Sequence, residues 1–317
     1  MCAKRNYMRG KILVTGASGL LGANLLMEAV KAGHDVIAVS NKHRIYIDGV
    51  KSLELDLAVG TNANDLVEEV EPDWIVNCAA LTNVDLCEED PHAAYSMNVK
   101  IPIALAKSAH RVGSAMIHIS TDSVFDGRRG DYWENDNVNP LNTYAMSKLI
   151  AEREVTAEMP EALIIRTNLY GWNMQSKSSF GEWILDKLST GQQVPAFNDV
   201  IFSPLLANHL ATIILEMLSM NAVGLYHVAS SDSCSKYEFA KRVATMFGFD
   251  ANLVLPVSLD SANLTATRPK NTSLRTDGIE RGLGIRMPDI DSGIRHFCDL
   301  GSSGFAKQLK EYSRDKN

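Results

Sequence analysis

A tyrosine and a lysine stand four positions apart, at Tyr144 and Lys148, within residues 140–159, whose composition indicates a helix. Residues four apart on a helix share one face, so both side chains can project into the same space. A free tyrosine has a pKa of about 10, and a neighbouring ammonium lowers it by stabilising the phenolate. We therefore expect Tyr144 to exchange protons with a substrate, with its pKa lowered by Lys148. The alternative is a ring packed beneath a lysine stem, an arrangement common on helices.

A glycine-rich turn near the N-terminus indicates that a dinucleotide binds there. A β-rich run at residues 12–15 leads into the turn, and an amphipathic helix follows it to about residue 32. Gly16 permits a tight turn, Gly19 lets the backbone approach a pyrophosphate, and Gly22 lets the helix pack closely on the strand. The helix N-terminus also offers free N–H groups and a positive dipole end to phosphates. The candidate cofactor contacts in this turn are Gly16, Ser18, Gly19, Leu20, Leu21 and Gly22.

The end of the second strand, residues 36–39, bears on the choice of cofactor. NAD sites usually carry a carboxylate here for the ribose hydroxyls. This chain has none, and Asn41, Lys42 and Arg44 follow instead. Lys42 or Arg44 fits a 2′-phosphate better, so NADP(H) is the preferred cofactor and NAD(H) the alternative. A solvated basic loop without a ligand is the other interpretation.

Two further strand ends are candidates for contact with the cofactor. Residues 53–57 form a short strand whose end can touch an adenine ring. Residues 74–77 form the fourth strand, and the small residues that follow it leave room for a cofactor beside the sheet. The candidate contacts at these two ends are Asp56, Leu57, Cys78, Ala79 and Ala80.

A helix is expected from Asp90 and Pro91, which provide an N-cap and a first-turn proline, to about residue 111. Asn98 lies within this helix. Two interpretations stay open for it: a surface polar residue, or a bridge that holds the active-site lysine or a water. Asn98 is included among the candidate cofactor contacts.

Strands and helices alternate without a break from residue 11 to residue 120. This alternation predicts an α/β fold of the Rossmann type, with a doubly wound parallel sheet and a smaller C-terminal substrate-binding lobe. We expect residues 1–167 to form the NADP-binding domain and residues 168–317 mainly the substrate-binding lobe. Part of the second half, about residues 200–228, is expected to return to the sheet.

Composition excludes several classes of function. The chain has 317 residues, of which 45% are hydrophobic and 22% charged, and its net charge is −7, which argues against general affinity for nucleic acid or anionic membranes. We find neither a signal peptide at the N-terminus nor an apolar run long enough to span a bilayer. The five cysteines lack metal-site spacing, so we expect reduced thiols, a cytoplasmic protein and no metal site.

The second half holds fewer signals. Residues 162–167 form the sixth strand, and Asn168 follows at its carboxyl end, where α/β proteins bind ligands. Asn168 either contacts a substrate phosphate or hydroxyl or caps a turn. Ser235 and Glu238 form a capping box that opens a helix to about residue 246. Arg268 lies in a loop and can clamp a nucleotide diphosphate.

Five motifs together resemble the extended short-chain dehydrogenase/reductases, and within them most closely the dTDP-4-dehydrorhamnose reductase branch. These motifs are residues 15–22, 77–80, 120–127, 140–148 and 268–271. The resemblance implies NADPH-dependent reduction of the 4-keto group of a nucleotide-linked 6-deoxy sugar. The implied partner is that nucleotide-diphosphate sugar, and a homodimer is one option for the assembly.

In this family Thr121, Tyr144 and Lys148 would form the catalytic set. The tyrosine would protonate the developing alkoxide as hydride arrives from the nicotinamide. The threonine would hydrogen-bond the substrate oxygen, and the lysine would also hold the nicotinamide ribose. The candidate substrate contacts are Thr82, Asp122, Ser123, Asn168 and Arg268.

Two departures from the family pattern leave the sugar open. Ser123 stands where the rhamnose-forming enzymes typically carry a tyrosine, and the tryptophan expected after Thr167 is absent. The same branch contains the regulatory β subunit of methionine adenosyltransferase, which the chain resembles at residues 169–171 and 236–238. A non-catalytic NADP-binding partner protein is therefore the first alternative. A sugar-nucleotide epimerase or dehydratase is the second.

Overall fold

The computed structural model describes residues 9–313. Cys2 and the segment on which the absence of a signal peptide was predicted lie outside the described residues. The other cysteines, Cys78, Cys87, Cys234 and Cys298, are free thiols. Within residues 9–313, no helix has the length and apolar character needed to cross a membrane.

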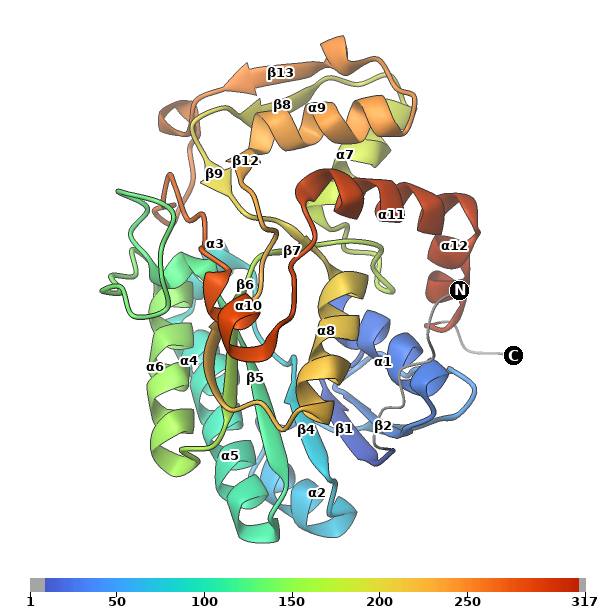
Figure 1. The fold of residues 1–317 in the computed structure, drawn as a ribbon, viewed down its shortest axis with the longest axis vertical. Helices are drawn as coiled ribbons and strands as arrows, with labels where there is room; N and C mark the ends of the chain where they lie inside the picture. The colour runs from blue at the N-terminus through green and yellow to red at the C-terminus, as the bar shows by residue number, and fades with distance from the viewer. Residues whose placement is uncertain (1–8, 314–317) are drawn as a thin grey trace.

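A parallel sheet forms the centre of the molecule, and in the described part of the chain it has seven strands (Figure 1). The strand order is β11-β6-β5-β4-β1-β2-β3, which places β1 between β4 and β2 as in a Rossmann-type doubly wound sheet. The predicted fold class is therefore confirmed. The strands are β1 (Lys11–Thr15), β2 (Asp35–Ser40), β3 (Val50–Glu54), β4 (Trp74–Asn77), β5 (Ala115–Thr121), β6 (Leu163–Thr167) and β11 (Gly224–His227).

Helices cover both faces of this sheet, which explains why its strands are apolar on both sides (Figure 1). On one face α1 (Leu20–Ala32) packs beside α8 (Ala207–Ser219), over one apolar cluster. On the other face lie α2 (Asn62–Val70), α5 (Ile101–Val112) and α6 (Thr143–Glu158), over a second cluster. Successive residues of a strand point to opposite faces of the sheet and so enter the two clusters in turn. The polar side chains near the carboxyl ends of the strands follow the same alternation.

The helix predicted from Asp90 to about residue 111 is divided. Asp90 caps α4 (Pro91–Tyr95) by accepting a hydrogen bond from Ala93 N at 2.9 Å, as expected. A π-helical turn (Ser96–Lys100) then precedes α5. Such π turns are rare and often lie near functional sites. This one contains Asn98.

The C-terminal lobe lies above the carboxyl ends of the strands (Figure 1). Its apolar core gathers side chains of α7, β8, α9, β13 and α11. Ser235 and Glu238 form the predicted capping box of α9. The elements of the lobe are α7 (Phe180–Ser189), β8 (Val194–Phe197), α9 (Lys236–Met246), β13 (Val254–Val257), α11 (Ile290–Ser302) and α12 (Phe305–Glu311). Two short strand pairs accompany them. In one, β7 (Leu169–Tyr170) pairs with β10 (Leu205–Leu206), and in the other, β9 (Ile201–Phe202) pairs with β12 (Cys234–Ser235). The remaining helices are α3 (Val84–Glu89) and α10 (Asp277–Leu283).

Candidate functional site

The glycine turn between β1 and α1 has the geometry of a dinucleotide site. Gly16 has a φ of +61°, and a Cβ at this position would lie 2.6 Å from Ala79 N. A Cβ on Gly22 would lie 2.7 Å from Ala17 Cα, so the helix can pack this closely only with glycine there. Gly19 is the N-cap of α1, and no side chain caps the helix. The first N–H groups of α1 are therefore free to bind a phosphate.

The loop after β2 holds the basic residues that the sequence assigned to a 2′-phosphate. Lys42 and Arg44 are both exposed, and neither forms an ion pair within the described residues. Ser40 shapes the loop by donating a hydrogen bond to the His43 carbonyl at 2.7 Å. Asp56, after β3, accepts a hydrogen bond from Ala58 N at 3.0 Å and so closes its own turn. Two cations are thus available to an anionic ligand at this edge of the sheet.

The burial of Asn98 decides against one of the two interpretations that the sequence left open. Asn98 is fully buried, so it is not a surface residue. Its amide accepts a hydrogen bond from Leu81 N at 2.7 Å and donates to Leu81 O at 3.1 Å and to Ser147 Oγ at 3.0 Å. It therefore braces the loop after β4 against α6, and its described bonds do not include Lys148. This loop also carries Cys78, Ala79 and Ala80.

The structure brings the proposed catalytic side chains together at the carboxyl end of β5. Asn142 caps α6 by accepting a hydrogen bond from Ala145 N at 2.9 Å, which sets the start of the helix. Tyr144 lies in its first turn, near the hydroxyl of Thr121, the last residue of β5, which acts to lower the tyrosine pKa. Lys148 follows one helical turn later and is only 2% exposed. The carboxyl end of β5 and the N-terminal end of α6 thus bring together Thr121, Tyr144 and Lys148.

The pKa values of this pair differ from the expectation. Burial, the largest cause, raises the pKa of Tyr144 to about 12, although the nearby Thr121 hydroxyl opposes that rise. Burial lowers the pKa of Lys148 to about 8. The expected lowering of the tyrosine pKa by Lys148 is therefore wrong for this arrangement. The physical reason is that burial disfavours the charged form of both groups.

The substrate-side residues form a hydrogen-bonded cluster around Asp122. Its Oδ2 accepts from Asn168 Nδ2 at 2.9 Å and from Thr272 Oγ1 at 2.6 Å. Its Oδ1 accepts from the hydroxyls of Thr121 and Ser123, each at 3.2 Å. Burial raises the pKa of the Asp122 carboxyl, and these four hydrogen bonds oppose the rise. Asn168 thus orients a buried carboxyl beside Thr121, a position that its sequence context did not reveal.

The two remaining substrate candidates have protein partners. Arg268 forms an ion pair with Asp85 of α3 at 3.0 Å and donates to the Ala266 carbonyl at 2.9 Å. Thr82 is exposed and accepts a hydrogen bond from Lys177 Nζ at 3.4 Å. Arg268 is therefore held in place by a carboxylate, which leaves its other guanidinium N–H groups for a ligand.

Lys236 is a cation in this region that was not among the predicted site residues. It is the first residue of α9, partly buried, with Nζ 5.4 Å from the ring centre of Phe180 and 6.0 Å from that of Phe202. Burial lowers its pKa, and Asp122 and Arg268 are the charges that act on it. It forms no ion pair within residues 9–313. A cation at a helix N-terminus is electrostatically unfavourable, so an anionic ligand would stabilise it.

His118 and Gln175 are two other residues that were not predicted. His118 lies within β5, and its Nε2 is 3.2 Å from Lys148 Nζ. Gln175 donates from Nε2 to Ser18 Oγ in the glycine turn at 2.8 Å. A polar residue inside an apolar strand was the available signal for His118. Nothing in the sequence around Gln175 marks its contact, because the partner is distant in the chain.

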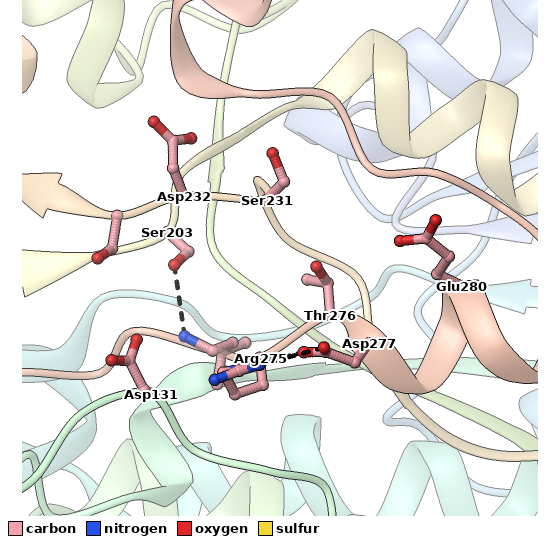
Figure 2. A pocket seen from close by; sticks show the side chains of 10 residues that line it. Asp131, Ser203, Ser231, Asp232, Arg275, Thr276, Asp277 and Glu280 are labelled. Atoms are coloured by element: carbon pink, nitrogen blue, oxygen red, sulfur yellow. Dashed lines mark hydrogen bonds and ion pairs between the residues drawn. The ribbon is translucent and has the colours of Figure 1, made fainter.

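A polar cavity of about 320 Å³ opens elsewhere, between α10 and the segment after β11 (Figure 2). It contains an ion pair between Arg275 and Asp277 at 2.8 Å, and Leu274 N donates to Ser203 Oγ at 3.3 Å. None of the predicted site residues lines it. The lining residues are Asp131, Ser203, Ser231, Asp232, Ser233, Leu274, Arg275, Thr276, Asp277 and Glu280.

Comparisons with known proteins agree on one family. Residues 10–302 match the family model described as the RmlD substrate binding domain. The probable low-salt glycan biosynthesis reductase Agl14 of Haloferax volcanii is 32% identical, over 89% of this chain and 95% of that protein. The methionine adenosyltransferase 2 subunit beta of Danio rerio is 31% identical, over 90% and 89%.

A solved structure is also similar over nearly the whole chain. It is the dTDP-4-dehydrorhamnose reductase of Bacillus anthracis in complex with NADP, with a TM-score of 0.82 and 29% identity. The match covers 92% of this chain and 99% of that one. The similarity therefore includes both the sheet and the C-terminal lobe.

Proposed function

The chain belongs to the RmlD substrate binding domain family, and we infer from this premise that it is an NAD(P)-dependent sugar-nucleotide reductase of the extended short-chain dehydrogenase/reductase type. One observation carries the inference. Thr121 ends β5 at the carboxyl edge of the sheet, its hydroxyl acts to lower the pKa of the nearby Tyr144, and Lys148 lies one helical turn further along α6. That edge also holds the glycine turn, so a dinucleotide and a carbonyl substrate can meet there.

We propose the following division of roles. A bound nicotinamide supplies the hydride for the carbonyl carbon. Tyr144 donates its phenolic proton to the carbonyl oxygen as negative charge develops there. The Thr121 hydroxyl turns from Asp122 Oδ1 to donate a hydrogen bond to the same oxygen. A phenol with a pKa of about 12 holds its proton until the substrate oxygen becomes basic enough to take it. Lys148 supplies positive charge beside the phenolate that remains.

NADP(H) is the proposed cofactor in preference to NAD(H). Lys42 and Arg44 are exposed and unpaired within the described residues, and no carboxylate ends β2. A 2′-phosphate gains a charge-assisted hydrogen bond from either side chain, whereas a ribose hydroxyl does not need a cation. The NADP complex of the Bacillus anthracis relative also supports this choice.

The proposed substrate is a nucleotide-linked 4-keto-6-deoxy sugar. The Bacillus anthracis relative is named a dTDP-4-dehydrorhamnose reductase. In this chain Ser123 stands where the family pattern places a tyrosine, and the expected tryptophan has no equivalent at residues 168–171. Ser123 and Asn168 both bond to Asp122. A more polar and wider sugar pocket follows, so we propose a preference for a related 4-keto sugar. Lys236 and Arg268 are the cations proposed to face its diphosphate.

NADPH oxidation with a panel of sugars tests this function. The panel contains dTDP-4-dehydrorhamnose and GDP- and UDP-linked 4-keto-6-deoxy sugars. We expect one of the related sugars to reach a kcat/KM in the ordinary enzyme range, about 10⁴–10⁸ M⁻¹s⁻¹. The highest efficiency with dTDP-4-dehydrorhamnose would contradict the proposed preference. Inactivity on all of them would contradict the reductase itself.

A second candidate function is that of a non-catalytic NADP-binding regulatory subunit. The observation in its favour is the 31% identity to the methionine adenosyltransferase 2 subunit beta of Danio rerio, over 90% of this chain. The same panel separates the two, because a regulatory subunit would bind NADPH and leave every sugar unchanged. Co-purification with a methionine adenosyltransferase catalytic subunit would then be the positive result for this alternative.

We also propose that the protein acts in the cytoplasm. The four cysteines within residues 9–313 are free thiols, which suits a reducing compartment. Cell fractionation followed by immunoblotting tests the location. Recovery with the extracytoplasmic fraction would contradict it.

A further inference from the structure

A row of three polar side chains crosses the sheet beneath the catalytic pair. In the strand register Thr15 of β1 lies beside Asn77 of β4, and Asn77 lies beside His118 of β5. Thr15 and His118 are fully buried, and Asn77 is 1% exposed. Thr15 Oγ1 is 2.6 Å from Asn77 Oδ1, and Asn77 Nδ2 is 3.0 Å from His118 Nδ1. The row continues to Lys148 Nζ, which is 3.2 Å from His118 Nε2.

The directions of these hydrogen bonds follow from one backbone group. The N–H of Ala79 can only donate, and it points at Asn77 Oδ1 at 3.2 Å. The oxygen of the Asn77 amide therefore faces Ala79, and the NH₂ group faces His118. Since that NH₂ group donates to His118 Nδ1, Nδ1 carries no proton. A neutral imidazole has one N–H, so the proton of His118 is on Nε2.

This tautomer places an N–H group against the lysine. An ammonium has three N–H donors and no lone pair, so it cannot accept a hydrogen bond from His118 Nε2. A neutral lysine amine can. The contact at 3.2 Å is therefore a good hydrogen bond only when Lys148 is deprotonated. Burial lowers the Lys148 pKa to about 8, which makes the neutral amine accessible near physiological pH.

Within residues 9–313 no carboxylate forms an ion pair with Lys148, although the charge of Glu152 acts to raise its pKa. Glu152 lies one turn further on α6, but it is paired with Arg166 at 2.7 Å and 2.9 Å. Cys78, after β4, has a pKa raised to about 12 by burial and stays a neutral thiol. Tyr144 lies one turn before and is neutral as well. Burial lowers the His118 pKa well below its ordinary value, and Lys148 adds to this, so His118 stays neutral.

We propose that His118, held as the Nε2–H tautomer by Asn77, is a positioning residue that binds the neutral form of Lys148 and thereby sets the pH at which the lysine loses its proton. This inference rests on the proposed reductase function. After Tyr144 has given its proton to the substrate oxygen, an N–H bond of the Lys148 ammonium breaks and the O–H bond of Tyr144 re-forms. His118 then holds the neutral amine until a proton from solvent restores the ammonium. Because the charged lysine is the active form, kcat/KM should fall as the pH rises through the Lys148 pKa.

The tautomer can be tested in the wild-type protein without substrate. Long-range ¹H–¹⁵N correlation spectra of protein labelled with ¹⁵N-histidine report which ring nitrogen carries the proton. The His118 signals are identified as those missing from His118→Phe. We expect an unprotonated Nδ1 and a protonated Nε2, with an Nε2 shift that moves as the pH passes through about 8. A proton on Nδ1, or a His118 spectrum that does not change in that range, would overturn the proposal.

The control of Lys148 is tested by Asn77→Asp. A carboxylate at this position draws the imidazole proton to Nδ1, which turns Nε2 into an acceptor for the Lys148 ammonium. We expect the alkaline limb of the pH profile of kcat/KM to move up by about one pH unit, because one net hydrogen bond shifts a pKa by about that much. His118→Phe, which removes the donor, should move it in the same direction. Asn208→Asp, the same change at a buried position of α8, should leave the limb in place.

Cofactor binding provides a readout that does not depend on turnover. The dissociation constant of NADPH, measured by fluorescence from about pH 6 to pH 10, should change slope near the Lys148 pKa of about 8. Asn77→Asp should shift that break upward. If the wild type reduces no sugar but the change in slope still moves upward in Asn77→Asp, the reductase function is contradicted and the role of His118 is supported. A break that stays in place in Asn77→Asp, as in Asn208→Asp, would show that the row is only structural.

Discussion

The glycine turn at residues 16–22 and the cluster around Asp122 would both contact ligands, but they offer different groups. The glycine turn presents backbone N–H groups of a helix with no side-chain cap. The cluster presents side chains that already bond to one another, with four donors on one buried carboxyl. A backbone site depends on a few residues close together in the chain. A side-chain site depends on partners that only the tertiary fold brings together. Variants in each region test whether the two sites differ in this way.

The largest effect is expected from Tyr144→Phe, which removes the hydroxyl between the two regions. General acid catalysis contributes about 10²–10⁴-fold, so kcat should fall by that factor while the NADPH dissociation constant stays nearly unchanged. Steady-state kinetics and fluorescence titration measure the two quantities. Tyr95→Phe, on the exposed face of α4, is the control and should behave as wild type. A Tyr144→Phe enzyme with the wild-type rate would show that the ring only packs.

Gly16→Ala should have the next largest effect, and it changes only the glycine turn. The added Cβ would lie 2.6 Å from Ala79 N at a φ of +61°, so the turn must shift. We expect NADPH to bind about tenfold more weakly or worse. Gly113→Ala has a similar φ of +77° but meets no atom within 4 Å, so it isolates the backbone strain from the clash. Equal NADPH affinity in both variants would contradict the assigned role of Gly16.

Lys236→Met tests the side-chain region. Losing a charge-assisted contact to a diphosphate should cost about 1.5–3 kcal/mol, or roughly a 10- to 100-fold rise in KM for the sugar nucleotide. NADPH affinity should not change. Lys241→Met removes an exposed lysine from the same helix and is the matched control. A KM unchanged in Lys236→Met would remove this lysine from the substrate site.

Arg44→Ala is expected to have the smallest effect, because the side chain is exposed and Lys42 can replace it in part. NADPH should bind up to about tenfold more weakly, and NADH should be unaffected. Lys51→Ala, an exposed cation on β3, serves as the control. Equal affinity of the wild type for NADPH and NADH would show that the basic loop does not recognise a 2′-phosphate.

The sequence predicted the parts of the molecule that depend on local pattern. The alternation of strands and helices gave the sheet class, and the glycine spacing marked a turn whose φ at Gly16 is indeed positive. Tyr144 and Lys148 share a helix, so their common face was also predictable.

The parts that the sequence did not predict depend on register and on distant partners. His118 acquires its role because the strand register places it beside Asn77. Arg268 meets Asp85 only through the path of the C-terminal loop. The pKa of Tyr144 was expected to fall and instead rises, because the burial that raises it depends on tertiary packing that the local sequence does not show.

Deuterium transfer tests the reductase function most directly. The wild-type protein is incubated with NADPH deuterated at the transferable position of the nicotinamide and with the preferred 4-keto sugar nucleotide, and the product is analysed by mass spectrometry and NMR. The reductase function predicts one deuterium on C4 of the sugar and a new hydroxyl at that carbon, and both are lost in Tyr144→Phe. Bound cofactor with no deuterium in any sugar of the panel would contradict it.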